Sequence, residues 1–223
     1  DKSGKQVLEA FMVRHHPQWL EARKIVESGQ IGQLNTVQSI FTYFNADPNN
    51  VRNKKDIGGG GLLDIGCYCV VGPRFVTAKE PVRVVSLMDK DPKFGTDRLV
   101  SGMLDFGSGL QASFVCGTQS AAVQRVHVLG TEGRVEILMP FNPIPENPAI
   151  IRVAGQKQPG FDEAREIKFP VCNHYTLQGE AATAIFKGES PVDYPIEDAI
   201  ANMQILDALA RSAKTGSWEM VKS

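Results

Sequence analysis

The stretch "RLVSGMLDFGSGLQASFVCGT", residues 98–118, decides the fold class of this chain. Two short runs of aliphatic, aromatic and β-branched residues flank Gly107-Ser108-Gly109, which is a good turn signal. Strands joined by so short a connection pair in antiparallel fashion, because parallel neighbours need a long crossover. The stretch therefore predicts two neighbouring strands of an antiparallel sheet.

Similar runs on both sides of this pair extend the predicted sheet. Residues 82–91 lie before it, and residues 123–130 and 134–140 follow it, with another turn signal at 131–133. Their close spacing predicts an antiparallel meander. Further β-rich runs are "NTVQSIFTYFNAD", "ENPAIIRVAG" and "EAREIKFP", at 35–47, 146–155 and 163–170.

Helical patterns come before and after these strands. One opens at Pro17 and ends at Gly29, and a second covers residues 62–76, where Gly72 and Pro73 are expected to disturb the last turns. The predicted fold class is α+β, with helices on one face of a large, mostly antiparallel open sheet. The last two helices are expected at 174–187 and 195–214, the latter with an apolar stripe formed by Ile196, Ile200, Met203, Leu206, Leu209 and Ala210.

The start of the chain predicts a different kind of element. "QVLEAFMVR", residues 6–14, is almost continuously apolar, which is typical of a central and often parallel strand. The residues before it, "DKSGKQ", read like the tail of a helix that ends at Gly4. A chain that begins with the end of one βα unit is expected to be a piece of something longer.

Composition narrows the possible functions. The 223 residues are 42% hydrophobic and 22% charged, which is ordinary for a globular chain that can bury a substantial core. With 24 basic and 25 acidic residues, the net charge of −1 gives no support for a nucleic-acid partner or an anionic membrane partner. No segment approaches the roughly 20 consecutive apolar residues of a membrane span. No metal site is predicted, and reduced thiols are expected at Cys67, Cys69, Cys116 and Cys172.

A run of four glycines, Gly58 to Gly61, lies in "DIGGGGLLDIGCYCVVGPR", residues 56–74. A dinucleotide fingerprint requires Gly-x-Gly-x-x-Gly directly after a strand. Here Leu63 occupies the third glycine position, and a charged loop precedes the run. Asp64, just inside the turn, would also repel a pyrophosphate. We therefore interpret the run as a flexible entry to a helix, where backbone approaches a ligand closely.

Asp64 and Tyr68 are four residues apart, which places them on the same face of the predicted helix. A phenol that exchanges a proton beside an orienting carboxylate is a plausible acid/base arrangement. The alternative is that Asp64 caps the start of the helix and Tyr68 only packs. The pattern alone leaves both interpretations open.

A series of motifs runs along almost the whole chain: "EAFMVRHHPQW", "IVESGQIGQL", "GGGGLLDIGCYCV", "SGMLDFGSGLQASF", "VLGTEGRVEI", "NHYTLQGEAATAI" and "DAIANMQILDALARSAKTGSW". Their order resembles the glucose-fructose oxidoreductase / inositol dehydrogenase / rhizopine-catabolism (Gfo/Idh/MocA) family. The resemblance implies an oxidoreductase that uses NAD or NADP and acts on a sugar, cyclitol or diol. It also implies an N-terminal Rossmann domain, with a glycine fingerprint and a Glu-Lys-Pro motif that are both missing from this sequence.

By this resemblance, residues 1–14 correspond to the last helix end and strand of the Rossmann domain. Residues 15–223 correspond to the C-terminal domain that binds substrate and dimerises. The resemblance implies a homodimer formed through the open face of the sheet, and a cytoplasmic location is expected. A non-enzymatic module that dimerises or binds a sugar is the competing hypothesis, and the isolated chain is expected to be inactive.

The family's helix signature is often written Asp-x-Gly-x-x-x-x-His. Asp64 and Gly66 match it, but Val71 stands where the histidine would be, and Tyr68 is present instead. The chain thus resembles the branch of dihydrodiol and xylose dehydrogenases, in which a tyrosine transfers the proton. The resemblance implies that Tyr68 and Asp64 are catalytic, and that the missing family lysine would normally make Tyr68 a better base.

Other candidate residues are weaker. Arg14 and His15 lie at the end of the strand predicted over residues 6–14, and Arg52 precedes the glycines; each is a candidate for binding substrate. His174 and Tyr175 resemble a substrate-contact position of the family. The backbone at Gly60 and Gly61 is expected to contact the cofactor.

Overall fold

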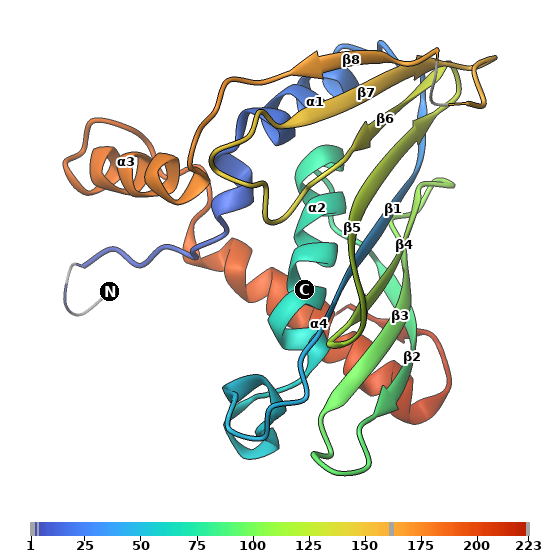
Figure 1. Cartoon of the computed structure of the whole chain (residues 1–223), viewed down its shortest axis with the longest axis vertical. Helices are drawn as coiled ribbons and strands as arrows, with labels where there is room; N and C mark the ends of the chain where they lie inside the picture. Colours follow the sequence, from blue (N-terminus) through green and yellow to red (C-terminus); the bar gives the residue numbers. More distant parts are fainter. Residues whose placement is uncertain (1–2, 4, 161–162, 222–223) are drawn as a thin grey trace.

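The computed structural model describes residues 3, 5–160 and 163–221, and in this part of the chain a nine-stranded sheet is the central element (Figure 1). The strand order is β8-β7-β6-β5-β1-β4-β3-β2-β9, and the sheet does not close on itself. The strands are β1 (Leu34–Phe44), β2 (Arg83–Lys90), β3 (Asp97–Asp105), β4 (Gln111–Gly117), β5 (Gln119–Gly130), β6 (Gly133–Ile137), β7 (Ile150–Gly155), β8 (Arg165–Lys168) and β9 (Glu219–Met220).

Strand β1 lies in the middle of this sheet, between β4 and β5. It runs parallel to β4, with Thr36 opposite Gln111, and antiparallel to β5, with Phe41 opposite Gln124. The other pairs are antiparallel, so the sheet is mixed. The predicted pairing of residues 98–118 is confirmed, but the prediction of an unbroken meander is wrong. In the sequence, only Thr118 stands between β4 and β5. In the sheet, however, β1 lies between these two strands and pairs with each of them.

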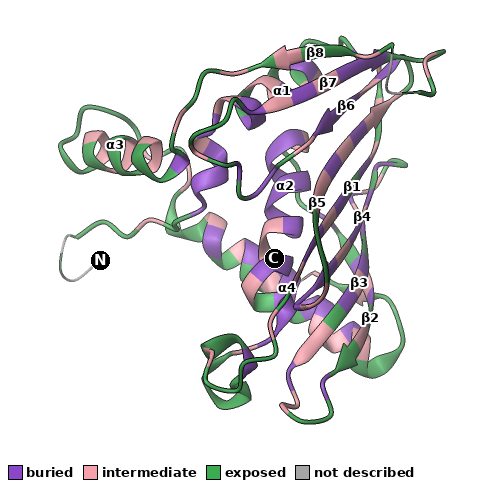
Figure 2. Cartoon of the chain, viewed as in Figure 1, coloured by how far each residue is buried: buried purple, intermediate pink, exposed green. Residues whose placement is uncertain are grey.

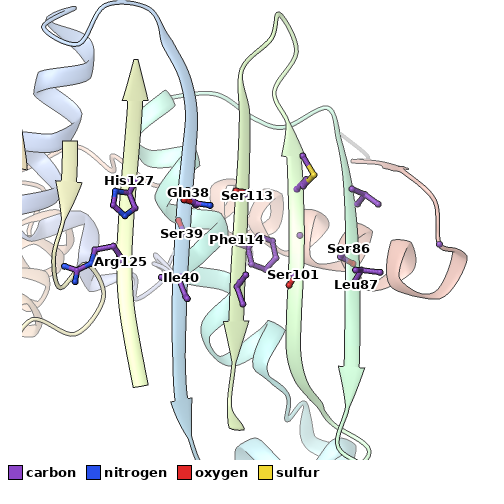
Figure 3. Close-up of a pocket in the computed structure, with 15 residues that line it drawn as sticks. Gln38, Ser39, Ile40, Ser86, Leu87, Ser101, Ser113, Phe114, Arg125 and His127 are labelled. Atoms are coloured by element: carbon purple, nitrogen blue, oxygen red, sulfur yellow. The ribbon is translucent and has the colours of Figure 1, made fainter. Parts of the chain in front are cut away.

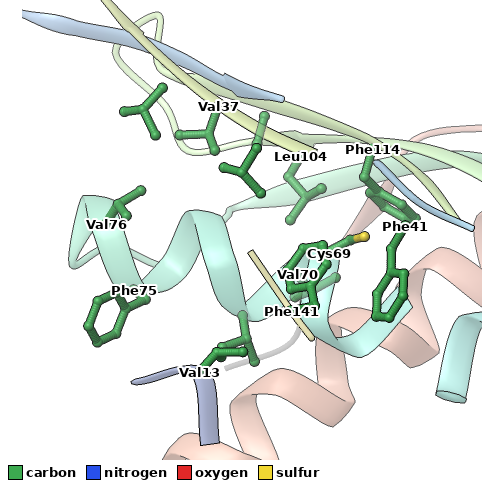
Figure 4. Packing of buried hydrophobic residues seen from close by; sticks show 14 of the residues in the cluster. Val13, Val37, Phe41, Cys69, Val70, Phe75, Val76, Leu104, Phe114 and Phe141 are labelled. Atoms are coloured by element: carbon green, nitrogen blue, oxygen red, sulfur yellow. The ribbon is translucent and has the colours of Figure 1, made fainter. Parts of the chain in front are cut away.

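Three helices cover one face of the sheet, as predicted: α1 (Pro17–Glu27), α2 (Cys67–Thr77) and α4 (Ile196–Thr215) (Figure 1). Figure 4 shows Val37, Leu104 and Phe114 of the sheet directed toward Cys69 and Val70 of α2. The buried side chains are concentrated between these layers, whereas α3 (His174–Phe186) stands apart and is largely exposed (Figure 2).

Helix α2 is not disturbed at Gly72 and Pro73 as predicted, because it continues through both residues to Thr77. Proline removes one helical hydrogen bond, and here burial of the whole segment from Cys69 to Val76 compensates for that loss. Gly72 serves helix packing instead, since a Cβ atom there would lie 2.8 Å from Cη2 of Trp19 on α1.

The strand predicted over residues 6–14 does not form. Residues 5–11 lack regular structure, and Met12–His15 forms a 3₁₀ turn. A strand needs a neighbour for its ladder of hydrogen bonds, and none of the described strands pairs with this segment. Phe11, Met12 and Val13 are buried in the helical layer, whereas Val7 is exposed. The helix end predicted at Gly4 lies outside the described residues.

Candidate active site

Asp64 and Tyr68 lie where the chain enters α2. Leu62–Gly66 forms a π-helical turn that leads directly into that helix. Gly66 allows the turn to pack closely on the sheet, since a Cβ atom there would come within 3.1 Å of Sγ of Cys116. Both Asp64 and Tyr68 line a pocket of about 530 Å³ with a half-polar lining. The pocket lies between the ends of β1 and β5 and the loop that precedes the glycines.

The carboxylate of Asp64 is held on both of its oxygens. The hydroxyl of Tyr43, on β1, donates a hydrogen bond to Oδ2. Nε of Arg52 donates to Oδ1 at 2.8 Å and forms an ion pair with it. The structure thus places Arg52 against Asp64, while contact of Arg52 with a substrate stays a prediction; it also adds Tyr43, which sequence reasoning missed.

Tyr68 has a largely apolar environment. Its ring packs edge-on against Phe11 with centroids 5.2 Å apart, and its hydroxyl lies 3.5 Å from Sδ of Met12. Burial raises the pKa of the phenol well above its usual value, and the nearby Cys67 adds to this shift. Asp64 and Tyr68 share the pocket, but the hydrogen bonds of Asp64 go to Tyr43 and Arg52.

The glycine run folds around Asp97, the first residue of β3. At Gly60, φ is +129°, and an added Cβ atom would lie 2.0 Å from Oδ1 of Asp97. Oδ2 of Asp97 accepts the backbone N–H of Leu62 at 2.6 Å. A Cβ atom added at Gly61 would lie 3.5 Å from the carbonyl oxygen of Asp97. The run therefore lets the backbone close over a carboxylate that caps the π-helical turn. Contact of Gly60 and Gly61 with a cofactor stays a prediction.

Arg14 and His15 are not brought to the pocket of Asp64. Arg14 is buried, pairs with Asp198 of α4 and lies 4.2 Å from the ring centroid of Tyr194. His15 lines a separate cavity of about 130 Å³ beside α3, and burial lowers its pKa with help from Arg14. Because the predicted strand at 6–14 does not form, the strand-end argument for these two residues fails.

His174 and Tyr175 separate at the start of α3. Tyr175 lines the pocket of Asp64 and is more than half exposed. His174 is buried and packs edge-on against His16, with ring centroids 6.0 Å apart; burial lowers its pKa. Of this pair, only Tyr175 lines the pocket of Asp64, and substrate contact by either residue stays a prediction.

Sequence reasoning missed further polar residues that line the same pocket: Asn45, Gln124 and Asn142. Tyr43 could have been found from strand phase, because Val37, Phe41 and Tyr43 alternate onto one face of β1. No signal in the sequence points to Gln124, because its place opposite Phe41 depends on the insertion of β1 beside β5.

The four cysteines are free thiols, as predicted. Burial raises the pKa of Cys67 to about 12, with Asp64 as a further cause. In the part of the chain that the structure describes, no group of three or more histidine, cysteine, aspartate or glutamate side chains could hold a metal ion. Within the same residues, no helix is long and apolar enough to cross a membrane.

Comparisons with known proteins show which proteins this chain resembles. A family model of the GFO/IDH/MocA C-terminal domain matches residues 19–136. An uncharacterized oxidoreductase of Rhizobium meliloti is 38% identical over 221 residues, which cover 99% of this chain and 66% of that protein. A D-xylose 1-dehydrogenase (NADP(+)) of Haloferax volcanii is 31% identical, over 97% of this chain and 65% of its own length. The chain thus spans about two thirds of each of these two relatives.

The fold also matches solved structures. A 3-ketoreductase from Actinomadura kijaniata, solved with NADP and TDP-benzene, superposes with a TM-score of 0.85 at 23% identity, over 95% of this chain and 63% of that one. The sheet and its helices therefore define an α+β domain of the kind found in these oxidoreductases. The chain belongs to the GFO/IDH/MocA family.

Proposed function

We propose that this protein binds the substrate and transfers the proton in an NAD(P)-dependent oxidoreduction at a hydroxyl-bearing carbon of a sugar, cyclitol or diol. The observation that carries the proposal is a pocket, lined by both polar and apolar side chains, that contains Tyr68 and Asp64 together. Both carboxylate oxygens of Asp64 accept a hydrogen bond there, one from Tyr43 and one from Arg52. Two relatives support the substrate class by their names: the xylose dehydrogenase of Haloferax volcanii, and the trans-1,2-dihydrobenzene-1,2-diol dehydrogenase of Sus scrofa, 32% identical over 61% of this chain and 41% of that protein.

Tyr68 is the proposed proton donor. Because burial keeps the pKa of its phenol high, the group is neutral at physiological pH and can donate to a carbonyl oxygen during reduction. Oxidation needs the reverse transfer, which requires a cation that lowers this pKa. The hydrogen-bond contact that the structure gives this hydroxyl is with Met12, not with a cation. Asp64, with Arg52 beside it, would orient the substrate hydroxyls.

The cofactor fits this chain only in part. The dinucleotide phosphates do not fit the glycine run, since the Asp97 carboxylate occupies the space next to Gly60 and accepts the N–H of Leu62. The pocket beside Tyr68 is large enough for a sugar and a nicotinamide ring, and any contact from Gly60 or Gly61 would come from backbone atoms. When bound, the nicotinamide supplies or accepts the hydride, and the chain's own residues bind, orient and protonate the substrate.

A homodimer through the outer face of the sheet is the proposed assembly. Figure 3 looks onto this face, where paired strands place Leu87, Ser101, Val115 and Ile40 in one row. These residues line a shallow, mainly apolar hollow of about 670 Å³, and Leu87 is 77% exposed. Exposed apolar side chains gathered on one face of a sheet are typical of a surface that pairs with another protein.

The test is turnover by the protein purified from its natural source. We expect NAD(P)H oxidation with a keto sugar, or NAD(P)⁺ reduction with a sugar, cyclitol or diol. Tyr68→Phe should lower kcat roughly 100-fold or more and leave cofactor affinity unchanged. Tyr194→Phe is the matched control, because the Tyr194 hydroxyl bonds to Arg23 outside the pocket. Near-normal turnover by Tyr68→Phe would exclude Tyr68 as the proton donor.

The second candidate function is sugar binding without redox chemistry. It is favoured by the Asp97 carboxylate, which occupies the space next to Gly60 where dinucleotide phosphates would have to bind. If it is correct, the protein from its natural source should bind sugar but give no saturable fluorescence change with NAD(P)H. Saturable binding of NAD(P)H by that protein would reject this candidate.

A further inference from the structure

Gln124 forms part of the pocket wall on strand β5. Its side-chain Oε1 accepts the backbone N–H groups of Phe141 at 3.2 Å and Asn142 at 2.9 Å. Only the oxygen of an amide can accept two such bonds, so the orientation of the amide group is fixed. Within the described residues, the Nε2 donors of Gln124 have no hydrogen-bond partner in the protein. A donor pair is thus held ready at a pocket that also contains a carboxylate.

The register of the sheet relates Gln124 to Asp64. Gln124 lies directly opposite Phe41, and Tyr43, two residues further along β1, holds Oδ2 of Asp64. The register between β1 and β5 shifts between Thr42 and Phe44, so Tyr43 lies just beyond the regular part of the ladder that pairs Phe41 with Gln124. Both side chains line the same pocket. One wall of the pocket therefore carries the proposed acid/base residues, Asp64 and Tyr68. A second wall carries Gln124, whose amide group can donate a hydrogen bond.

We propose that Gln124 is a specificity-determining residue that donates a hydrogen bond to a second oxygen of the substrate, away from the carbon that is oxidised or reduced. This inference rests on the proposed function for its class of ligand, and it narrows that class. A simple vicinal diol has only two oxygens, and both are used once they contact Tyr68 and Asp64, so none is left for Gln124. A ring sugar or a cyclitol carries oxygens on opposite sides of its ring and can contact all three residues.

The substitution Gln124→Glu isolates the donor. A glutamate keeps an oxygen that accepts the N–H groups of Phe141 and Asn142, while the two Nε2 donors are replaced by an acceptor. Gln111→Glu is the matched control, because Gln111 is exposed on β4 and does not line the pocket. Circular dichroism and thermal unfolding should show that both variants fold like the parent chain.

Binding of D-xylose and its monodeoxy and monodeoxyfluoro analogues is then measured by NMR titration of the ¹⁵N-labelled chain. At one ring position, we expect the unmodified chain to prefer hydroxyl over fluorine and fluorine over hydrogen, because fluorine can still accept from Gln124. Loss of that hydroxyl should weaken binding about 3- to 10-fold, which corresponds to one hydrogen bond. In the Gln124→Glu variant, fluorine should become the worst substituent, since it faces an acceptor. The control variant should keep the original order.

The outcomes separate this inference from the proposed function. If D-xylose shifts the signals of Tyr68 but the two chains rank the analogues identically, Gln124 is not a recognition residue, whereas the proposed function stands. If ethane-1,2-diol shifts the same signals as strongly as D-xylose and myo-inositol do, the narrowing to ring substrates is overturned. If none of the three compounds shifts any pocket signal, the inference falls, and turnover by the protein from its natural source still decides the proposed function.

Discussion

The hydroxyl of Tyr43 donates a hydrogen bond to Oδ2 of Asp64, and this contact ties the central strand β1 to the turn that opens α2. Arg52 holds the other oxygen from the loop before the glycines. The carboxylate is thereby fixed from two sides, by the end of β1 and by the loop that follows this strand. A group positioned in this way can orient a substrate without first losing rotational freedom.

Removing the Tyr43 hydroxyl should therefore disturb catalysis more than folding. For Tyr43→Phe we expect kcat to fall about 10-fold with KM changed less than about 3-fold, because Asp64 loses one of the two bonds that orient it. The measurement is steady-state kinetics with whichever sugar or cyclitol the protein turns over. Tyr194→Phe serves as control here as well. A rise in KM at constant kcat would mean that Tyr43 contributes only to binding.

The sequence predicted most elements of the fold, because strands and helices leave local signals. Alternating and β-branched runs indicated β2 to β8, and the apolar stripe indicated α4. The place of β1 could not be predicted, since pairing across the sheet leaves no trace in local pattern. The apolar run at 6–14 was misassigned for a related reason. Burial makes a segment apolar whether it lies in a strand or in a 3₁₀ turn packed on helices.

The candidate site was predicted in part. Asp64, Tyr68, Arg52 and Tyr175 line one pocket, and three of them come from the glycine-rich loop or the helix that follows it. These three residues lie near one another in the sequence, so the local pattern was enough to predict that they share a site. The partners on β1 and β5, Tyr43 and Gln124, reach the pocket only through the tertiary arrangement of the sheet.

The closure of the glycine run over Asp97 gives a second prediction. Gly60→Ala should destabilise the fold by at least about 3 kcal/mol, since it combines a strained φ of +129° with a Cβ atom 2.0 Å from the Asp97 carboxylate. Gly107→Ala is the matched control. It also has a positive φ, of +77°, but it faces open space, so a loss of about 1 kcal/mol is expected. Urea unfolding measures both, and equal losses would show that contact with Asp97 does not matter.

The buried His16 gives a third prediction, on pH dependence. Burial, with His174 nearby, lowers the pKa of His16 to about 4, and its Nδ1 accepts the N–H of Gln18 at the start of α1. In the unfolded chain the pKa is about 6.5, so the unfolded state binds the extra proton first as pH falls. Stability should therefore be full above about pH 6.5 and decline toward pH 4, by up to about 3 kcal/mol from this group.

The variant His16→Asn tests this assignment. Asparagine can still accept the N–H of Gln18 as a helix cap but does not titrate. Urea unfolding at pH 7.5 and pH 5 should show a smaller loss of stability for the variant than for the parent chain. His127→Asn, on the outer face of the sheet, is the comparison: burial also lowers the pKa of this half-buried histidine, so the variant measures how much a histidine away from α1 contributes. If the pH dependence of His16→Asn equals that of the parent, His16 is not the responsible group.

The outer face of the sheet gives the last prediction. Leu87 lies at one end of the apolar row with Ser101, Val115 and Ile40 and is 77% exposed in the single chain. In a homodimer formed through this face, Leu87→Glu would bury a charge without a partner. We expect sedimentation velocity to show a dimer for the parent chain and a dissociation constant at least 10-fold higher for the variant. Val51→Glu, at a 58% exposed residue of the loop before the glycines, should leave the dimer intact. A dimer of unchanged strength in Leu87→Glu would place the interface on another surface.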